Sequence, residues 1–314
     1  MTKPNKPLAR MPSVSAVVSA SPWQGLSRGD RFFENEHIRS FINRAAAYAA
    51  AGVPLHLTGP AGMGKTSFAI KIAEEFGRPV SFMSGNEWLT SQDFIGREVG
   101  QSESTIVDKY VQSVRRTETN TRRDWKDAIL AVSMRNGYTL VYDEFTRASP
   151  QANSILLPVI EEGVLVSTDR VSHDPYIQAH PDFRIILTSN CDEYVGVNGA
   201  PDALVDRLVT LTLPELSVET LAGIASYRTG LDPYTCSRIV KLVGDLRNAV
   251  ERRKASSLRS VLLIARIAAS RVMVEQLDDV TLSRIAGDVL RGRGFDVADT
   301  TIAQSLAEMT EVSP

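Results

Sequence analysis

Several features that mark common protein classes are scarce or missing in this sequence. Two cysteines, Cys191 and Cys236, are too few for a disulfide framework or a zinc cage, so we interpret both as reduced thiols. The four histidines show no spacing typical of metal ligands, so the sequence does not support a transition-metal catalytic site. A formal net charge of −2 gives no basic field for nucleic acid, and no run reaches the roughly 20 apolar residues of a membrane helix. We therefore expect a soluble, cytoplasmic protein with no nucleic-acid partner and no membrane span.

What is present suffices for a large core. The chain has 314 residues, 43% of them hydrophobic, and this length predicts about two domains. Residues 1–28 are rich in Pro, Ser and Lys without periodicity, which predicts a flexible leader. Strand-like and helical patterns mix up to Pro214, and only helical periods follow it. We therefore expect an α/β nucleotide-binding core over residues 29–214 and a smaller all-α region over residues 215–314.

The most informative stretch is a glycine-rich motif that reads G-x-x-x-x-G-K-T. It consists of Gly59, Pro60, Ala61, Gly62, Met63, Gly64, Lys65 and Thr66, with Ser67 next. This is the phosphate-binding loop of nucleotide hydrolases: Lys65 would reach the β- and γ-phosphates, and Thr66 would be a Mg²⁺ ligand. A strand-like segment precedes the loop and a helical one follows it, which places phosphate at a helix N-terminus. The motif predicts ATP and Mg²⁺ as ligands.

A second stretch places two acids at the end of an apolar segment. Residues 137–142 have the composition of a buried strand, and Asp143 and Glu144 follow at once. Two carboxylates at the carboxyl end of a buried strand are costly unless they serve a cation or a reaction. Asp143 is predicted to hold Mg²⁺, and Glu144 to polarise the attacking water.

The rest of the chain gives coarser expectations. A first amphipathic helix is predicted from Phe33 to Gly52, and a helix beginning at Pro150 carries Ile155, Leu156, Val159 and Ile160. Residues 164–181 are turn-rich and predict a hairpin-like insertion. Ile106, Tyr110, Val111 and Val114 have helical spacing, and Trp125, Ile129 and Val132 predict the next helix. The segment Phe183–Asn190 is a further buried strand with a polar end.

The motifs together resemble a known family. The phosphate loop, the strand ending in Asp143–Glu144, the strand ending at Asn190 and the helical tail resemble an AAA+ ATPase, and residues 89–96 and 143–148 resemble signatures of its MoxR branch. Residues 137–147 and 180–184, followed by Thr-Ser-Asn at 188–190, are similar to the gas vesicle protein N family, GvpN. The resemblance runs from about Phe33 to Pro214. It implies an AAA+ core with a central parallel sheet flanked by helices and a C-terminal helical lid.

The resemblance also implies roles for further residues. Asn190 would be the sensor-1 group that positions the attacking water. Arg207 matches the arginine finger, which reaches the ATP of a neighbouring subunit, and the alternative is a surface ion pair. Arg259 is similar to the sensor-2 arginine of the lid. The family usually has proline where Leu258 stands, so for Arg259 a helix-surface ion pair stays open.

The implied function is ATP hydrolysis in a homo-oligomeric ring, a hexamer, that assists assembly and growth of the gas vesicle shell. Its partners would be shell or accessory proteins, and it would associate with the vesicle in the cytoplasm. Two alternatives stay open. One is a MoxR-type activase that remodels a partner enzyme or inserts its cofactor. The other is a nucleotide-gated scaffold with little turnover, against which Glu144, Asn190 and Arg207 argue.

Overall fold

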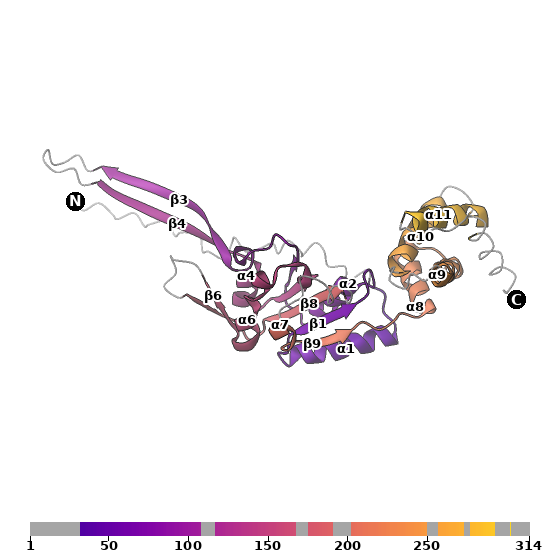
Figure 1. Ribbon diagram of the computed structural model, residues 1–314, viewed down its shortest axis with the longest axis horizontal. Coiled ribbons are helices and arrows are strands. Elements are labelled where there is room, and N and C mark those ends of the chain that lie inside the picture. The colour runs from indigo at the N-terminus through magenta and orange to yellow at the C-terminus, as the bar shows by residue number, and fades with distance from the viewer. Residues whose placement is uncertain are drawn as a thin grey trace, which may run out of the picture.

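The computed structural model describes residues 32–107, 117–167, 175–190, 202–249, 257–272, 277–292 and Ile302. The predicted leader at residues 1–28 and Cys191 lie outside these residues. The described part is an α/β core followed by a helical region (Figure 1). None of the helices described is both long and apolar enough to cross a membrane.

Five parallel strands form the central sheet, in the order β2-β5-β8-β1-β9. Their bounds are β1 (Leu55–Gly59), β2 (Val80–Ser84), β5 (Thr139–Asp143), β8 (Arg184–Asn190) and β9 (Val209–Thr212). The inner strands are apolar because both faces of the sheet are covered. The order makes β5, β8 and β1 neighbours, so their carboxyl ends meet at one edge.

Successive strand residues point to opposite faces of the sheet and so enter two different cores. Val141 and Ile186 pack with the helices α1 (Glu36–Ala50) and α2 (Lys65–Glu74). Leu140 and Leu187 pack with α4 (Ile129–Asn136) and α6 (Leu156–Glu162) on the other face. The helices thereby fix the sheet on both sides.

The first helix forms as its sequence predicts, with a start that local chemistry explains. Asn35 accepts a hydrogen bond from the Ile38 backbone N–H (2.9 Å), which caps α1. Phe33 lies before the helix rather than in it. The Asn35 side chain also donates to Thr220 Oγ1 (2.9 Å) in the helix α8 (Val218–Thr229) and so links the core to the helical region.

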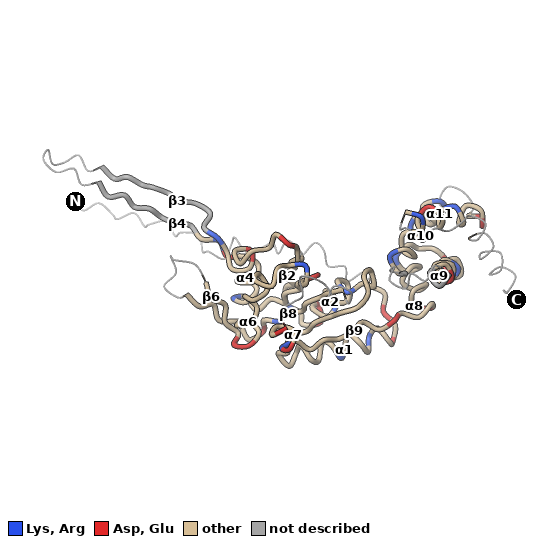
Figure 2. Tube along the Cα trace, viewed as in Figure 1, with Lys and Arg blue, Asp and Glu red and all other residues tan. Residues whose placement is uncertain are grey.

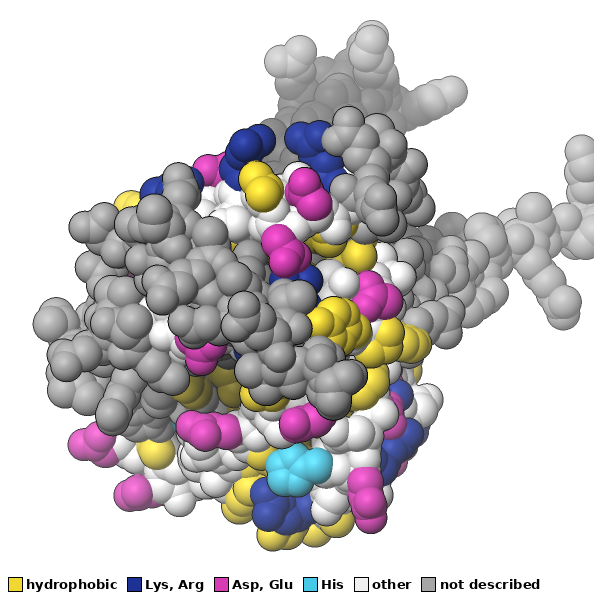
Figure 3. Space-filling model, turned by 90° about the vertical axis from the view of Figure 1, so that its right-hand side faces the viewer, with side chains coloured by type: hydrophobic (Ala, Val, Ile, Leu, Met, Phe, Trp, Pro, Cys, Tyr) yellow, Lys and Arg dark blue, Asp and Glu magenta, His cyan; other side chains and the backbone are white. Residues whose placement is uncertain are grey.

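The C-terminal helices pack around a hydrophobic core of their own. They are α8, α9 (Pro233–Ala249), α10 (Ser257–Val272) and α11 (Asp279–Arg291). The core they share includes Leu242, Ile264 and Leu282. Basic and acidic residues are scattered along the described trace, which is otherwise mostly uncharged (Figure 2). The face at this end likewise mixes charged and hydrophobic side chains (Figure 3).

The helix predicted around Ile106 is wrong. The chain forms a long antiparallel hairpin there, with strands β3 (Gly96–Val107) and β4 (Thr117–Asp127), which extends away from the body (Figure 1). Tyr110, Val111 and Val114 lie outside the described residues, and Trp125 belongs to β4. The helical spacing was the local signal, but this segment is rich in Thr, which favours strands, and cross-strand pairing overrides the period.

The helix predicted from Pro150 is divided in two. The short helix α5 (Pro150–Asn153) begins as expected, with Ser149 as its cap, and α6 begins only at Leu156. Pro158 has no N–H to donate to the Ser154 carbonyl, and the Leu157 N–H donates to that carbonyl instead (3.2 Å), in a tighter turn.

The hairpin predicted within 164–181 is present as β6 (Val164–Val166) and β7 (Tyr176–Gln178). Short helices α3 (Ser91–Ile95) and α7 (Asp202–Val205) and the 3-10 turn η3 (Phe145–Arg147) complete the described elements.

Candidate active site

The glycine-rich loop joins β1 to α2. Gly62 (φ 76°) and Gly64 (φ 90°) adopt the left-handed region, where a side chain would be strained. Helix α2 begins at Lys65, so its first N–H groups point toward the loop. Backbone N–H groups and the helix dipole together favour an anion at this position. The glycine-rich segment therefore joins a strand to the start of a helix, the order of elements that the sequence predicts.

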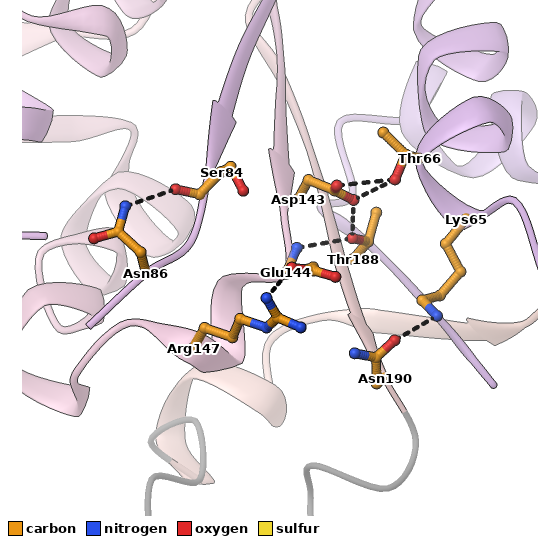
Figure 4. A network of polar contacts seen from close by, with 9 residues as sticks. All are labelled: Lys65, Thr66, Ser84, Asn86, Asp143, Glu144, Arg147, Thr188 and Asn190. Atoms are coloured by element: carbon orange, nitrogen blue, oxygen red, sulfur yellow. Dashed lines mark hydrogen bonds and ion pairs between the residues drawn. The ribbon is translucent and has the colours of Figure 1, made fainter. Parts of the chain in front are cut away.

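The Lys65 ammonium lies at the centre of this loop. Its side chain is buried and donates to the carbonyls of Gly59 (2.9 Å) and Pro60 (2.8 Å) and to Asn190 Oδ1 (2.7 Å). These acceptors are neutral oxygens, whereas phosphate oxygens are charged and bind an ammonium more strongly. The bond to Asn190 brings together two predicted site residues that are far apart in the sequence (Figure 4).

The Asp143 carboxylate forms the second part of the site. The Thr66 hydroxyl donates to Asp143 Oδ1 (2.8 Å) and Oδ2 (2.9 Å), and Thr188 Oγ1 donates to Oδ1 (2.5 Å). A hydroxyl and a carboxylate are the hard oxygen donors that Mg²⁺ prefers. In the described residues no group of three or more His, Cys, Asp or Glu side chains could hold a metal. A Mg²⁺ ion held by Thr66 and Asp143 would complete its shell with phosphate oxygens and water, as Mg²⁺ usually does in nucleotide sites.

Glu144 adopts a conformation that is rare for a residue with a side chain. Its φ is 53°, the one positive φ among the described non-glycine residues. The Glu144 N–H donates to Thr188 Oγ1 (3.0 Å), and Arg147 Nη1 lies 2.8 Å from Glu144 Oε2 in an ion pair (Figure 4). A Cβ at Gly85 would lie 2.1 Å from the Glu144 carbonyl oxygen, so only glycine fits there. Such strain persists where the surroundings fix it, as in active sites.

A cavity of about 530 Å³ contains these groups. Besides the loop, Asp143, Glu144, Arg147 and Asn190, it is lined by apolar side chains (Phe32, Phe33, Ile38, Leu216, Ile224, Leu258, Leu262) and by basic ones from the helical region (Arg228, Arg259, Arg266). An apolar part beside a glycine loop and several cations suits a flat base joined to a polyphosphate. The cavity thus fits ATP in size and chemistry.

The predicted lid arginine lines this cavity, and two others lie with it. Arg259 is on α10 near the start of the helix. Arg266 is seven residues later, two helical turns along the same face, and Arg228 is on α8. Neither Arg228 nor Arg266 was predicted, although the seven-residue spacing from Arg259 was visible in the sequence.

Arg207 does not occur among the described residues that line the cavity. Its Nε donates to Glu161 Oε1, and its Nη1 donates to the Ala203 carbonyl (2.5 Å). Both partners of the Glu161 pair are substantially exposed. Within one subunit the structure therefore brings together Lys65, Thr66, Asp143, Glu144, Asn190 and Arg259, but not Arg207.

Two polar residues beside the site were not predicted. Thr188, two residues before Asn190, bonds to both Asp143 and Glu144. His56 lies in β1 with its side chain fully buried, and burial lowers its pKa to about 4. The signal for His56 was a polar ring between two apolar strand residues, and the signal for Thr188 was its place in the polar end of a buried strand.

The unfolding free energy is expected to fall as the pH is lowered from about 6.5 to about 4. In that range His56 binds a proton in the unfolded chain but stays neutral in the folded chain, so lower pH favours the unfolded chain. The stability that neutral His56 contributes is therefore complete above pH 6.5 and is lost as the pH falls to about 4. A shift from 6.5 to about 4 corresponds to about 3 kcal/mol. Urea unfolding across this range, compared with His56→Gln, measures it. A variant that loses stability as steeply as the wild type would contradict the assignment.

Replacing Lys65 by alanine is expected to abolish measurable ATP binding, because the ammonium that would neutralise the β- and γ-phosphates is lost. Titration calorimetry with ATP and Mg²⁺ measures this. Lys71→Ala is the matched control, since Lys71 lies on the same helix but pairs with Glu34 outside the cavity. ATP affinity near the wild-type value in Lys65→Ala would refute the phosphate-loop assignment.

The glycine-rich loop, the paired acids at the end of β5, the strand order of the parallel sheet and the C-terminal helical region agree together with the AAA+ class of ATPases. A family model described as "AAA domain (dynein-related subfamily)" matches residues 54–208. The chain is 37% identical to the gas vesicle ATPase GvpN of Ancylobacter aquaticus over 266 residues, which cover 84% of this chain and 74% of that protein. The chain belongs to the gas vesicle ATPase GvpN family and is an ATPase.

One further relative and one solved structure are similar to this chain. Protein CbbQ of Hydrogenophilus thermoluteolus is 23% identical over 201 residues, 64% of this chain and 68% of CbbQ, in agreement with the MoxR type. A solved structure of a RuvB mutant from Thermotoga maritima is similar in fold, with a TM-score of 0.51, 16% identity, and coverage of 85% of this chain and 72% of that one. The predicted fold class, an AAA+ core with a C-terminal helical region, is confirmed.

Proposed function

We propose that this chain hydrolyses ATP in a Mg²⁺-dependent manner within a homo-oligomeric ring, a hexamer, and that hydrolysis assists growth of the gas vesicle shell. The observation that carries the proposal is the similarity to a gas vesicle ATPase along most of the chain. The polar groups at the sheet edge support it, because they supply the parts that phosphoryl transfer needs. The proposed location is the cytoplasm, at the vesicle, with shell or accessory proteins as partners.

The proposed mechanism assigns one task to each group at the sheet edge. The loop N–H groups and Lys65 hold the β- and γ-phosphates. Thr66 and Asp143 would hold Mg²⁺, which neutralises charge between those phosphates when bound. Glu144 accepts a proton from the attacking water, and Asn190 orients that water from the neighbouring strand. Arg259 contacts the nucleotide from the helical region.

Arg207 is proposed to act on the neighbouring subunit. Its side chain is exposed shortly after α7, and it is not among the described residues that line the cavity of its own chain, as expected of a group donated across an interface. An arginine that meets the γ-phosphate from outside stabilises the charge that develops during transfer. Each site would therefore be complete only in the assembled ring.

The test uses a host that carries the remaining gas vesicle genes and receives this gene as wild type, as Glu144→Gln or as Glu162→Gln. Glu162→Gln is the matched control, because it makes the same chemical change at an exposed residue at the end of α6. At equal protein levels, Glu144→Gln is expected to leave vesicles few or small in electron micrographs, while Glu162→Gln gives wild-type vesicles. Vesicles of normal size and number with Glu144→Gln would show that hydrolysis does not serve shell growth.

A further inference from the structure

The buried imidazole of His56 links the strand of the phosphate loop to both of its neighbours. His56 Nε2 and Ser189 Oγ in β8 form a hydrogen bond of 2.8 Å. His56 Nδ1 and Thr210 Oγ1 in β9 form one of 3.0 Å. β1 lies between these two strands, so one ring bonds across both ladders.

Each partner of the ring is close in sequence to a residue with a predicted catalytic role. Ser189 immediately precedes Asn190, and Thr210 follows Arg207 by three positions. The ring also meets Phe145, the residue after Glu144, edge to face with centroids 5.3 Å apart. Three separate chain segments that carry predicted catalytic groups therefore meet at one side chain.

Burying an imidazole at this position costs free energy unless both of its nitrogens form hydrogen bonds. A polar ring in a strand covered on both faces loses its hydration, and both of its nitrogens must find partners. Leu55 and Leu57 on either side of it are fully buried and apolar. A satisfied buried network instead fixes one arrangement of its members, since any shift breaks a hydrogen bond in a low dielectric.

The arrangement that this network fixes includes the contact between loop and sensor strand. β1 and β8 pair so that Thr58 lies beside Ser189 and Gly59 beside Asn190. The Asn190 side chain accepts from Lys65 at 2.7 Å at the end of the same ladder. A displacement of Ser189 would carry Asn190 with it, because the two are consecutive.

We propose that His56 is a positioning residue for ATP hydrolysis, which holds Asn190 in place through Ser189 and the strand following Arg207 through Thr210. The proposal rests on the proposed roles of Asn190 and Arg207. Simple core packing is the alternative, and it predicts lower stability with normal turnover in the folded protein. A positioning role predicts lower kcat with unchanged ATP affinity, because the phosphate loop itself is intact.

The variants His56→Leu, His56→Gln, His56→Asn and Ser189→Ala test this in the full-length chain. His56→Leu and Ser189→Ala are each expected to lower kcat about tenfold or more, since small misplacements of catalytic groups have large effects. The ATP dissociation constant is expected to change less than about twofold. Glutamine places its amide where Nε2 was and can reach Ser189, whereas asparagine matches Nδ1 and Thr210. His56→Gln should therefore recover more kcat than His56→Asn.

A double variant and a separate control make the outcome decisive. His56→Leu combined with Ser189→Ala should be no slower than His56→Leu alone, because His56→Leu already removes the link to Ser189. Should His56→Leu fail to fold, Ser189→Ala alone decides. Normal kcat in the folded variants, with only stability reduced, would overturn the proposal.

Asn190→Ala distinguishes the proposed role of Asn190 from the inference on His56. If it loses turnover while His56→Leu and Ser189→Ala do not, the role of Asn190 stands and the inference on His56 is wrong. If Asn190→Ala turns over ATP normally, the proposed role of Asn190 fails and the inference fails with it.

Discussion

Replacing Arg207 by alanine is expected to lower ATP turnover by about 10³-fold or more, as loss of an arginine finger does. ATP binding is expected to stay normal, because Arg207 is not among the described residues that line the cavity of its own subunit. Steady-state turnover and calorimetry on the same preparation measure the two effects. Wild-type turnover per subunit should also rise with protein concentration as rings assemble.

The alternative for Arg207 is a structural ion pair with Glu161. Both side chains are more than a third exposed, and pairs of this kind contribute little to stability. Glu161→Gln is the matched control, since it weakens the pair and keeps the arginine. We expect Glu161→Gln to retain turnover. Normal turnover in Arg207→Ala would leave the ion pair as its role.

Glu144→Gln is expected to lower turnover by about 10²-fold or more, the usual contribution of a positioned proton acceptor. The amide has the size of the carboxylate but cannot accept the proton of the attacking water. Binding is expected to persist, because Lys65, Thr66 and Asp143 are unchanged. Calorimetry and phosphate release measure both quantities.

The bound but unhydrolysed state should accumulate as a larger species. Light scattering after size exclusion should detect the assembled ring of Glu144→Gln with ATP, together with any client that it retains. Glu162→Gln again serves as the control. Unimpaired phosphate release by Glu144→Gln would move the catalytic base to another residue.

The phosphate loop and the acidic strand end could be predicted because their chemistry is local. A loop that cradles phosphate needs glycine at Gly62 and Gly64, and a strand that ends in Asp143 and Glu144 is rarely structural. The parallel sheet followed from apolar strands alternating with helical patterns. Asn190 required more than spacing. Resemblance to a family suggested it, and the structure adds its bond to Lys65.

The hairpin of β3 and β4 could not be predicted from the period of apolar residues. Its strands pair residues that are far apart in the sequence, such as Gly96 with Asp127, and a local window does not contain such pairs. The four apolar residues Ile106, Tyr110, Val111 and Val114 have the spacing of one face of a helix. Pairing between strands that are distant in the sequence determines the structure instead.

Residues that act through other residues were missed for a related reason. Thr188 and His56 matter through partners on other strands, and strand order is not written in the spacing of a single segment. Arg266 joins Arg259 only because both face the cavity from one helix. Each residue was visible in the sequence as a polar or charged side chain, but the residues that it contacts on other elements were not.

Mixed rings provide the most direct measurement of the central claim, a site shared between subunits. Glu144→Gln subunits keep Arg207, and Arg207→Ala subunits keep Glu144, so each preparation alone is nearly inactive. When the two are mixed, an Arg207→Ala site that faces the intact arginine of a Glu144→Gln neighbour should regain ATP turnover, in proportion to such pairs. No recovery in rings shown by tagged subunits to be mixed would contradict an arginine donated across the interface at position 207.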